Sequence, residues 1–290
     1  MTQQPPPPPL PLPLPSIAEP FQLPFHYGAL HNIGIDYLVE PGPVRDVLAV
    51  AHPGLTVALF DERACVSLNY QLYFAQYAAG SSVTEEIEIN IVAYPRGQEH
   101  RLARMSYPDY AQGVDQTKLL GIGRIRVLCD NPFAIDAGTL LYAEPKHPGR
   151  FTASMPSLNG PTGQTWTVHA FDAELNDDGR LTEDGKELFT FTARLDALPA
   201  VEANNTPITG YGTDPEGRLL AGPMNVYHPY HLHLLTPETT NRVTLDITTP
   251  DSPAGRDLST LIGNAPAAGV WTYQSAPVAA HNRPYFLPGV

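Results

Sequence analysis

The chain has 290 residues, and its 30 acidic and 17 basic side chains give a formal net charge of -13. Such a surface repels phosphate backbones and anionic headgroups, which argues against nucleic acid and membranes as partners. Neither a stretch of membrane-spanning length nor the basic patch and apolar run of a secretory signal is recognisable, so we expect a cytoplasmic protein.

Proline dominates residues 1–20 (MTQQPPPPPLPLPLPSIAEP). Proline lacks a backbone N–H and favours a solvated polyproline II conformation. We therefore predict a disordered tail over 1–20 and a single domain over 21–290. The P-x-x-P spacing in the tail also suits an aromatic-lined groove, although an inert extension is the simpler interpretation.

After the tail, short segments alternate between apolar and polar residues. A period of two is typical of half-buried strands. The pattern predicts an α+β, β-rich fold in which an antiparallel sheet curls towards a barrel, with a few short helices. The segments are 64–76, 83–93, 122–128, 164–171, 188–195, 226–235 and 242–248.

Three helices are indicated by their end signals. Ser106 precedes the first, which Gly121 would end, and the segment RDLSTLIG would end at Gly263. The clearest start is Asn131-Pro132, because an asparagine side chain caps the first turn and a proline there loses no hydrogen bond. This helix must end before Pro145.

Lysine is rare in this chain, which has only Lys118, Lys146 and Lys186. Lys118 suits the carbonyl end of the helix that Gly121 would end, and Lys186 lies in a polar turn. Lys146 differs, because it follows the helix that begins at Asn131 and lies between two prolines that restrict the backbone. The sequence therefore predicts a rigidly held amine at Lys146.

The segment CDNPFAIDAGTLLYAEPKHPGRF, residues 129–151, resembles the signature of the acetoacetate decarboxylase-like family. In that family an Asp-Asn pair and a Gly-Arg-Glu helix start lead to Pro-Lys-Lys, whose first lysine forms a Schiff base with the substrate. The resemblance implies that Lys146 has this role, and that the fold covers about residues 25–285. Activation of such an amine requires loss of its proton, by desolvation or by a neighbouring cation.

The strand expected over 83–93 supplies a candidate acid or base. Alternation places Glu85 on one face with the isoleucines, and Glu86, Glu88 and Asn90 on the other. A carboxylate on an apolar face is costly unless it is paired or protonated, so Glu85 is a candidate for proton transfer. It also matches the family's Tyr-x-Glu carboxylate, whereas a strand-end Glu that reaches solvent is the simpler interpretation.

Three differences from the family concern charge. Thr139-Leu140 replaces the Arg-Glu pair, His147 replaces the second lysine, and the stretch around Tyr37 lacks the expected arginine. With His147 as its neighbour, Lys146 would depend mainly on burial to lower its pKa.

We expect a Schiff-base enzyme that acts on a keto acid or another carbonyl compound, either as a decarboxylase or as an aldolase and dehydratase, without metal or cofactor. A homo-oligomer is the family's usual state.

Two alternatives come from other protein classes. His231, His233 and Glu238 partly match the first metal motif of cupins, in which alternating histidines and a later carboxylate bind a transition metal. His228 falls on the opposite face and suits the core. A barrel that binds a small apolar ligand without catalysis is the other alternative, but it has no need of an isolated amine at Lys146. The two cysteines, Cys65 and Cys129, suit structural burial.

Overall fold

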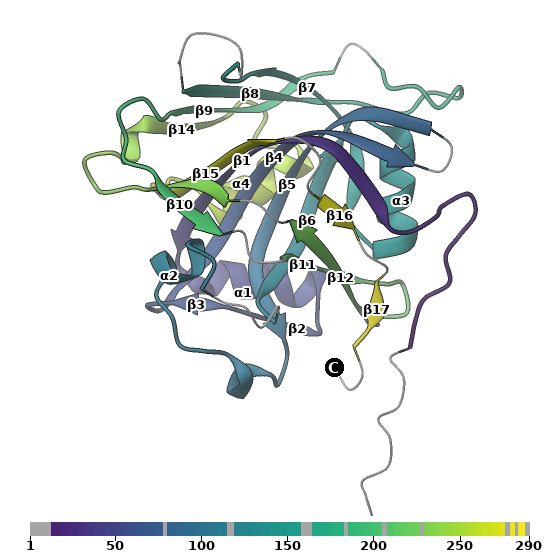
Figure 1. Ribbon diagram of the computed structural model, residues 1–290, viewed down its shortest axis with the longest axis horizontal. Coiled ribbons are helices and arrows are strands. Elements are labelled where there is room, and N and C mark those ends of the chain that lie inside the picture. Colours follow the sequence, from purple (N-terminus) through teal and green to yellow (C-terminus); the bar gives the residue numbers. More distant parts are fainter. Residues whose placement is uncertain are drawn as a thin grey trace, which may run out of the picture.

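The structure is a computed structural model that describes residues 13–77, 80–114, 119–157, 164–182, 185–204, 208–226, 229–275, 279–281 and 284–287. Its main feature is a large, strongly curved mixed sheet (Figure 1). The expected strands are present, because alternating residues bury one face of each. The strands are β1 (Phe25–Val39), β2 (Leu55–Val57), β3 (Leu59–Phe60), β4 (Arg63–Tyr77), β5 (Gly80–Pro95), β6 (Gly121–Cys129), β7 (Lys146–Ser154), β8 (Thr165–Asp172), β9 (Glu187–Arg194), β10 (Val201–Asn204), β11 (Ile208–Thr213), β12 (Leu219–Val226), β13 (Pro229–Leu234), β14 (Val243–Ile247), β15 (Ala267–Ser275), β16 (Ala279–His281) and β17 (Tyr285–Phe286).

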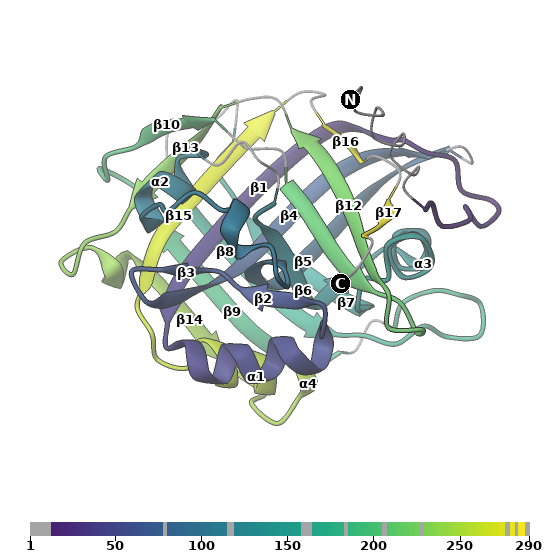
Figure 2. The ribbon, with the colours of Figure 1, turned by 90° about the horizontal axis from the view of Figure 1, so that it is seen from below.

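Helices are short and lie at the margins of the sheet. Helix α3 lies beside β7 and β12 at one end, whereas α1 and α4 lie next to each other at another (Figure 2). The helices are α1 (Pro41–Ala51), α2 (Tyr107–Ala111), α3 (Pro132–Tyr142) and α4 (Pro253–Leu261), with 3₁₀ turns at Glu99–Arg101 and Thr240–Arg242. In the described ranges, no helix is long and apolar enough to cross a membrane.

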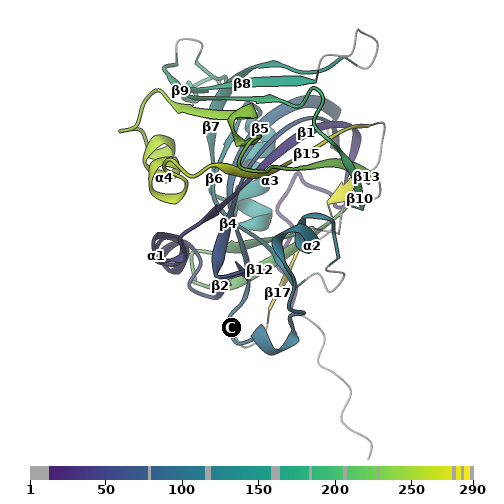
Figure 3. The same cartoon turned by 90° about the vertical axis from the view of Figure 1, so that its left-hand side faces the viewer.

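The main apolar core lies between two layers of strands. One layer contains β1, β4 and β5, and the other contains β8, β9 and β14, which cover it from above in Figures 1 and 3. Ile87, Ile89 and Ile91 of β5 point into this core together with Phe189 and Phe191 of β9, all of them at most 1% exposed. The face of β5 that holds the isoleucines is therefore the one that the alternation predicts.

The opposite face of the β1–β4–β5 layer is polar and also buried. It carries Asn69 and Gln71 on β4, directly opposite Glu88 and Glu86 on β5. Figure 2 shows β12 crossing over these strands on this side. Both faces of β5 are thus enclosed, one by apolar and one by polar side chains.

Four details differ from the sequence-based expectation. The sheet curls but is not closed into a barrel, and β6 and β11 pair over only two residue pairs. It is mixed rather than antiparallel, since β6 pairs in parallel with both β7 and β11. The helix after Ser106 ends at Ala111, well before Gly121. Ile17, within the expected tail, packs against a small core around Phe21, while residues 1–12 lie outside the described ranges.

Candidate active site

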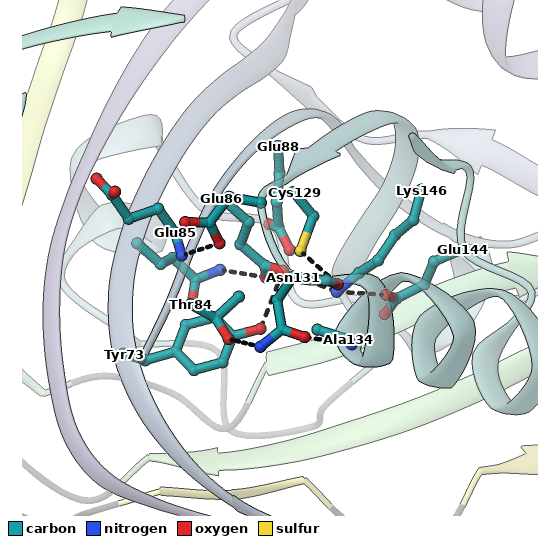
Figure 4. Close-up of polar contacts among 12 residues, drawn as sticks. Tyr73, Thr84, Glu85, Glu86, Glu88, Cys129, Asn131, Ala134, Glu144 and Lys146 are labelled. Atoms are coloured by element: carbon teal, nitrogen blue, oxygen red, sulfur yellow. Dashed lines mark hydrogen bonds and ion pairs between the residues drawn. The ribbon is translucent and has the colours of Figure 1, made fainter. Parts of the chain in front are cut away.

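Helix α3 begins with the predicted cap. The Asn131 side-chain oxygen accepts hydrogen bonds from the backbone N–H groups of Phe133 and Ala134 at 3.0 and 3.3 Å. Its amide nitrogen donates to the hydroxyls of Ser82 and Thr84 on β5 at 2.7 and 2.9 Å (Figure 4). One side chain therefore both starts the helix and attaches it to the sheet.

The end of α3 places Lys146 at the start of β7. Ala143 has the left-handed conformation, with φ of 51°, which turns the chain out of the helix. The next strand then pairs in parallel with β6, with Lys146 opposite Val127. Parallel neighbours require such a crossover, here a helix between two strands. The amine thus projects from a strand end that a helix and two sheet strands hold in position.

Gly138 in α3 leaves room for the lysine side chain. A Cβ at this position would lie 2.6 Å from Cδ and Cε of Lys146 and 2.6 Å from Oε2 of Glu144. Real Cβ atoms do not approach other atoms so closely. The absence of a side chain at 138 is therefore a condition for the observed path of Lys146 across the helix.

The Lys146 ammonium contacts two carboxylates. Its Nζ lies 2.7 Å from Oε2 of Glu86 on β5 and 3.7 Å from Oε2 of Glu144, as Figure 4 shows. Glu86 also accepts hydrogen bonds from the Tyr73 hydroxyl at 3.1 Å and the Gln71 amide at 3.4 Å. The Lys146 and Glu86 side chains are each only 7% exposed, so water screens the pair weakly.

Arg124 of β6 extends this cluster. Its guanidinium lies 2.8 Å from Glu88 and 3.2 Å from Glu144. Three carboxylates and two cations are thus buried together, which leaves an excess of one negative charge when all five groups are ionised. A buried excess of this kind favours proton uptake by one carboxylate.

The pKa shifts follow from burial and from these charges. Burial alone would lower the pKa of Lys146, but its neighbours, Glu86 first and then Cys129 and Glu144, raise it well above its ordinary value. Burial raises the pKa of Glu86, and Glu88 and Glu144 add to this, against the opposing effect of Lys146. Lys146 therefore rests as an ammonium beside a carboxylate that accepts a proton more readily than usual.

A pocket opens above the Lys146–Glu86 pair. It has an empty volume of about 380 Å³, counted out to the solvent. Aromatic and small side chains surround the charged groups, so a bound molecule meets one polar centre in an otherwise apolar wall. The lining residues are Phe25, Tyr27, Tyr73, Glu86, Arg124, Ala134, Ala137, Gly138, Tyr142, Glu144, Lys146 and Met224.

Glu85 lies on the other face of β5 from this pocket. Its carboxylate accepts a hydrogen bond from the Tyr70 hydroxyl, and in Figure 4 it points away from Lys146. Burial raises the pKa of Glu85, against the lowering by Tyr70. The structure thus brings Glu86, and not Glu85, to the amine.

His147 also lies away from the pocket. It is exposed, and successive residues of a strand point to opposite sides, so it faces away from the Lys146 amine. Burial of part of its ring and the charge of Arg126 lower its pKa, and Asp257 opposes them. Lys186 is exposed as expected, and Lys118 falls outside the described residues.

The sequence alone does not single out the four other members of this cluster, two of which contact the amine. Alternation predicts Glu86 and Glu88 on the face opposite the isoleucines, but it does not predict that both are buried. Glu144 lies two residues before Lys146, within the motif itself. Arg124, a charged residue in the middle of a predicted strand, was the available signal for a buried ionic site.

The cupin-like residues do not form a metal site in the described part of the chain. His233 is buried, and its Nδ1 lies 3.1 Å from the Pro199 carbonyl oxygen, whereas His231 and Glu238 are exposed. Within the described ranges, no group of three His, Cys, Asp or Glu side chains is arranged to hold a metal ion. His228 falls outside those ranges.

No family model and no curated protein matches this sequence. Solved structures do match its fold. The enduracididine biosynthesis enzyme MppR, complexed with pyruvate, is 13% identical, with a TM-score of 0.62 over 93% of this chain and 92% of that one. An acetoacetate decarboxylase structure is 15% identical, with a TM-score of 0.58 over 94% and 95%. The acetoacetate decarboxylase of Legionella pneumophila is 10% identical, with a TM-score of 0.55 over 95% and 92%. The chain therefore has the fold of the acetoacetate decarboxylase-like enzymes.

Proposed function

We propose that this chain is an enzyme in which Lys146 forms a Schiff base with a keto acid or another carbonyl compound, and that it acts as a lyase of the decarboxylase type. The observation that carries the proposal is the amine of Lys146, which lies in the lining of a pocket and 2.7 Å from a carboxylate with a raised pKa. A buried amine and a proton acceptor in contact are what imine formation requires.

The chemistry begins with proton transfer from the Lys146 ammonium to Glu86. The neutral amine then adds to the substrate carbonyl carbon, and loss of water leaves an iminium. The iminium draws the electron pair of the adjacent C–C bond as CO₂ departs, which gives an enamine. Glu86 has by then given its proton to the departing water, so it takes up another from solvent and passes it to the enamine carbon. Hydrolysis of the resulting iminium releases the product and restores the Lys146 ammonium.

An aldol condensation followed by dehydration is the second candidate. Its support is that MppR, with a TM-score of 0.60, has been solved with the condensation product of pyruvate and imidazole 4-carboxaldehyde. The same iminium loses an α-proton instead of CO₂ on this route, and the resulting enamine adds to an aldehyde. Release of CO₂ from a β-keto acid, compared with a new conjugated absorbance from pyruvate and an aldehyde, distinguishes the two.

Reductive trapping tests the proposal. Borohydride in the presence of a panel of keto acids and ketones should attach the carbonyl compound to Lys146, as located by peptide mass mapping. Lys146→Met should abolish this labelling, whereas Lys186→Met, a change at an exposed lysine, should leave it intact. Labelling confined to Lys118 or Lys186 would refute the Schiff-base role.

A further inference from the structure

A second pocket adjoins the one above Lys146. It shares Arg124 and Met224 with the first pocket and has an empty volume of about 400 Å³, counted out to the solvent. Its wall is rich in side-chain amides, unlike the aromatic wall of the first pocket. The lining residues are Asn32, Asn69, Gln71, Glu88, Ile122, Arg124, Gly210, Gly222, Met224, Trp271 and Tyr273.

Asn32 lines this pocket and has an unused hydrogen-bond acceptor. The residue is 2% exposed, and its side-chain oxygen finds no donor among the residues that the structure describes. Its amide nitrogen donates to the backbone oxygen of Tyr70 at 3.0 Å and to Oδ1 of Asn69 at 2.7 Å. A backbone carbonyl only accepts, so the nitrogen must face Tyr70 and the free atom is the oxygen.

The neighbours hold this orientation. Asn69 accepts from Asn32, and its own amide nitrogen donates to Glu88 at 3.2 Å. Glu88 is in turn paired with Arg124 at 2.8 Å and accepts from Asn90 at 2.8 Å. Since a carboxylate accepts and does not donate, Glu88 determines which way Asn69 points, and Asn69 determines which way Asn32 points. A buried acceptor held this way costs free energy unless a donor reaches it.

We propose that the second pocket binds the distal end of the carbonyl substrate, and that the Asn32 side-chain oxygen accepts a hydrogen bond from an uncharged N–H or O–H group there. This inference rests on the proposed function, because it assumes that the reacting carbonyl lies at Lys146. Glu88 and Arg124 line this pocket as an ion pair, and the buried cluster to which they belong has one more carboxylate than cation, so an anionic distal group is disfavoured. The substrate class is a carbonyl compound with a terminal carboxamide or hydroxyl.

The test uses three homologous series of methyl ketones. One series, which begins with levulinamide, ends in a carboxamide. In the second an isopropyl group of the same shape replaces the carboxamide, and the third, which begins with levulinate, ends in a carboxylate. Dissociation constants are measured by isothermal titration calorimetry for the wild-type protein, and the rate of borohydride trapping is measured in parallel.

At the best chain length, the carboxamide should bind at least about tenfold more tightly than the isopropyl ketone and more tightly than the carboxylate, since a lost partner leaves the acceptor buried and unpaired. Asn32→Leu should remove the preference for the carboxamide. The control Asn241→Leu, at an exposed position, should retain it. Equal binding of the carboxamide and isopropyl series by the wild-type protein overturns the proposal, whether or not Asn32→Leu folds.

The two readouts separate this inference from the proposed function. Trapping at Lys146 without a carboxamide preference refutes the Asn32 site and leaves the Schiff base in place. A carboxamide preference that Asn32→Leu removes, without trapping of any ketone, supports the site and refutes the Schiff base. Failure of every ketone to bind overturns the Asn32 proposal.

Discussion

The partners of Lys146 determine the protonation state of its amine more than its burial does. Activation of a buried lysine is usually attributed to desolvation, which lowers its pKa. Here Glu86 and Glu144 outweigh desolvation, and the resting state is an ion pair. The reactive amine must then be generated within the site, by transfer of the proton to Glu86.

Substitution of Glu86 tests this view through pH. Glu86→Gln removes the anion 2.7 Å from Nζ, so the pKa of Lys146 should fall, and the rise of trapping rate with pH should begin about one to three pH units lower. Turnover should nevertheless fall by roughly 10²–10⁴, because the proton acceptor is lost. The measurements are trapping rate against pH and steady-state turnover.

Glu85→Gln is the matched control on the same strand. It lies on the opposite face, against Tyr70, so the pH profile of trapping should stay as in the wild type. A shift in Glu85→Gln together with an unchanged profile in Glu86→Gln would restore Glu85 as the partner of the amine.

Asp130 provides a second pH-dependent test, of stability. Burial raises the pKa of Asp130 to about 6, despite a hydrogen bond from the Glu85 backbone N–H at 2.7 Å. A carboxyl with a raised folded-state pKa contributes stability below its unfolded pKa, and this contribution is lost as the pH rises through about 6. The amide of Asp130→Asn does not titrate, so the stability of this variant minus that of the wild type should increase as the pH rises from about 4 to about 7. Urea unfolding across this range measures the difference, and a constant difference would contradict the assignment.

At the scale of elements, α3 and β7 form one unit that carries the amine. The Asn131 cap connects the helix to β5, and the left-handed residue Ala143 redirects the chain into a strand parallel to β6. The acid on β5 and the amine on β7 therefore belong to elements that hydrogen bonds hold on both sides. Precise placement of this kind is what proton transfer over 2.7 Å requires.

Gly138 is the position in α3 where this placement is most easily disturbed. Gly138→Ala should favour the helix itself, yet its Cβ would displace the Lys146 side chain, so trapping should slow by about 10² or more while the fold is kept. The control is Gly42→Ala in α1, where a Cβ meets nothing within 4 Å. That variant should gain up to about 1 kcal/mol in stability and trap normally. Equal trapping rates in both variants would show that Gly138 does not determine the path of the lysine.

At the scale of the whole molecule, the β1–β4–β5 layer separates two buried regions, an apolar core and a polar site. The isoleucine face stabilises the fold, and the carboxylate face holds the site. Ile89→Ala should lower the free energy of unfolding by about 2–5 kcal/mol, because a fully buried side chain leaves a cavity. Val83→Ala, at a position on the same strand that is 59% exposed, should change it by less than about 0.5 kcal/mol. Chemical denaturation measures both, and similar losses would contradict the two-faced arrangement.

The local sequence pattern determined the strand faces, the start of α3 and the choice of Lys146 as the candidate amine. Alternation places the isoleucines of β5 on one face and Glu86 and Glu88 on the other, because the side-chain period of a strand is two wherever the strand lies. The cap at Asn131 and the rarity of lysine likewise single out α3 and Lys146 without reference to any distant contact. These features depend only on neighbours in the chain.

Only the tertiary structure decided which carboxylate meets the amine. The alternation of residues along β5 does not predict whether its polar face is open to water. In the structure, α3 and strands far along the chain, including β12 and β15, enclose this face. Enclosure turns Glu86, Glu88 and Arg124 from ordinary surface residues into a buried ionic cluster, since burial is what makes partners obligatory. Glu85, on the face that the sequence marks as internal, pairs with Tyr70 instead.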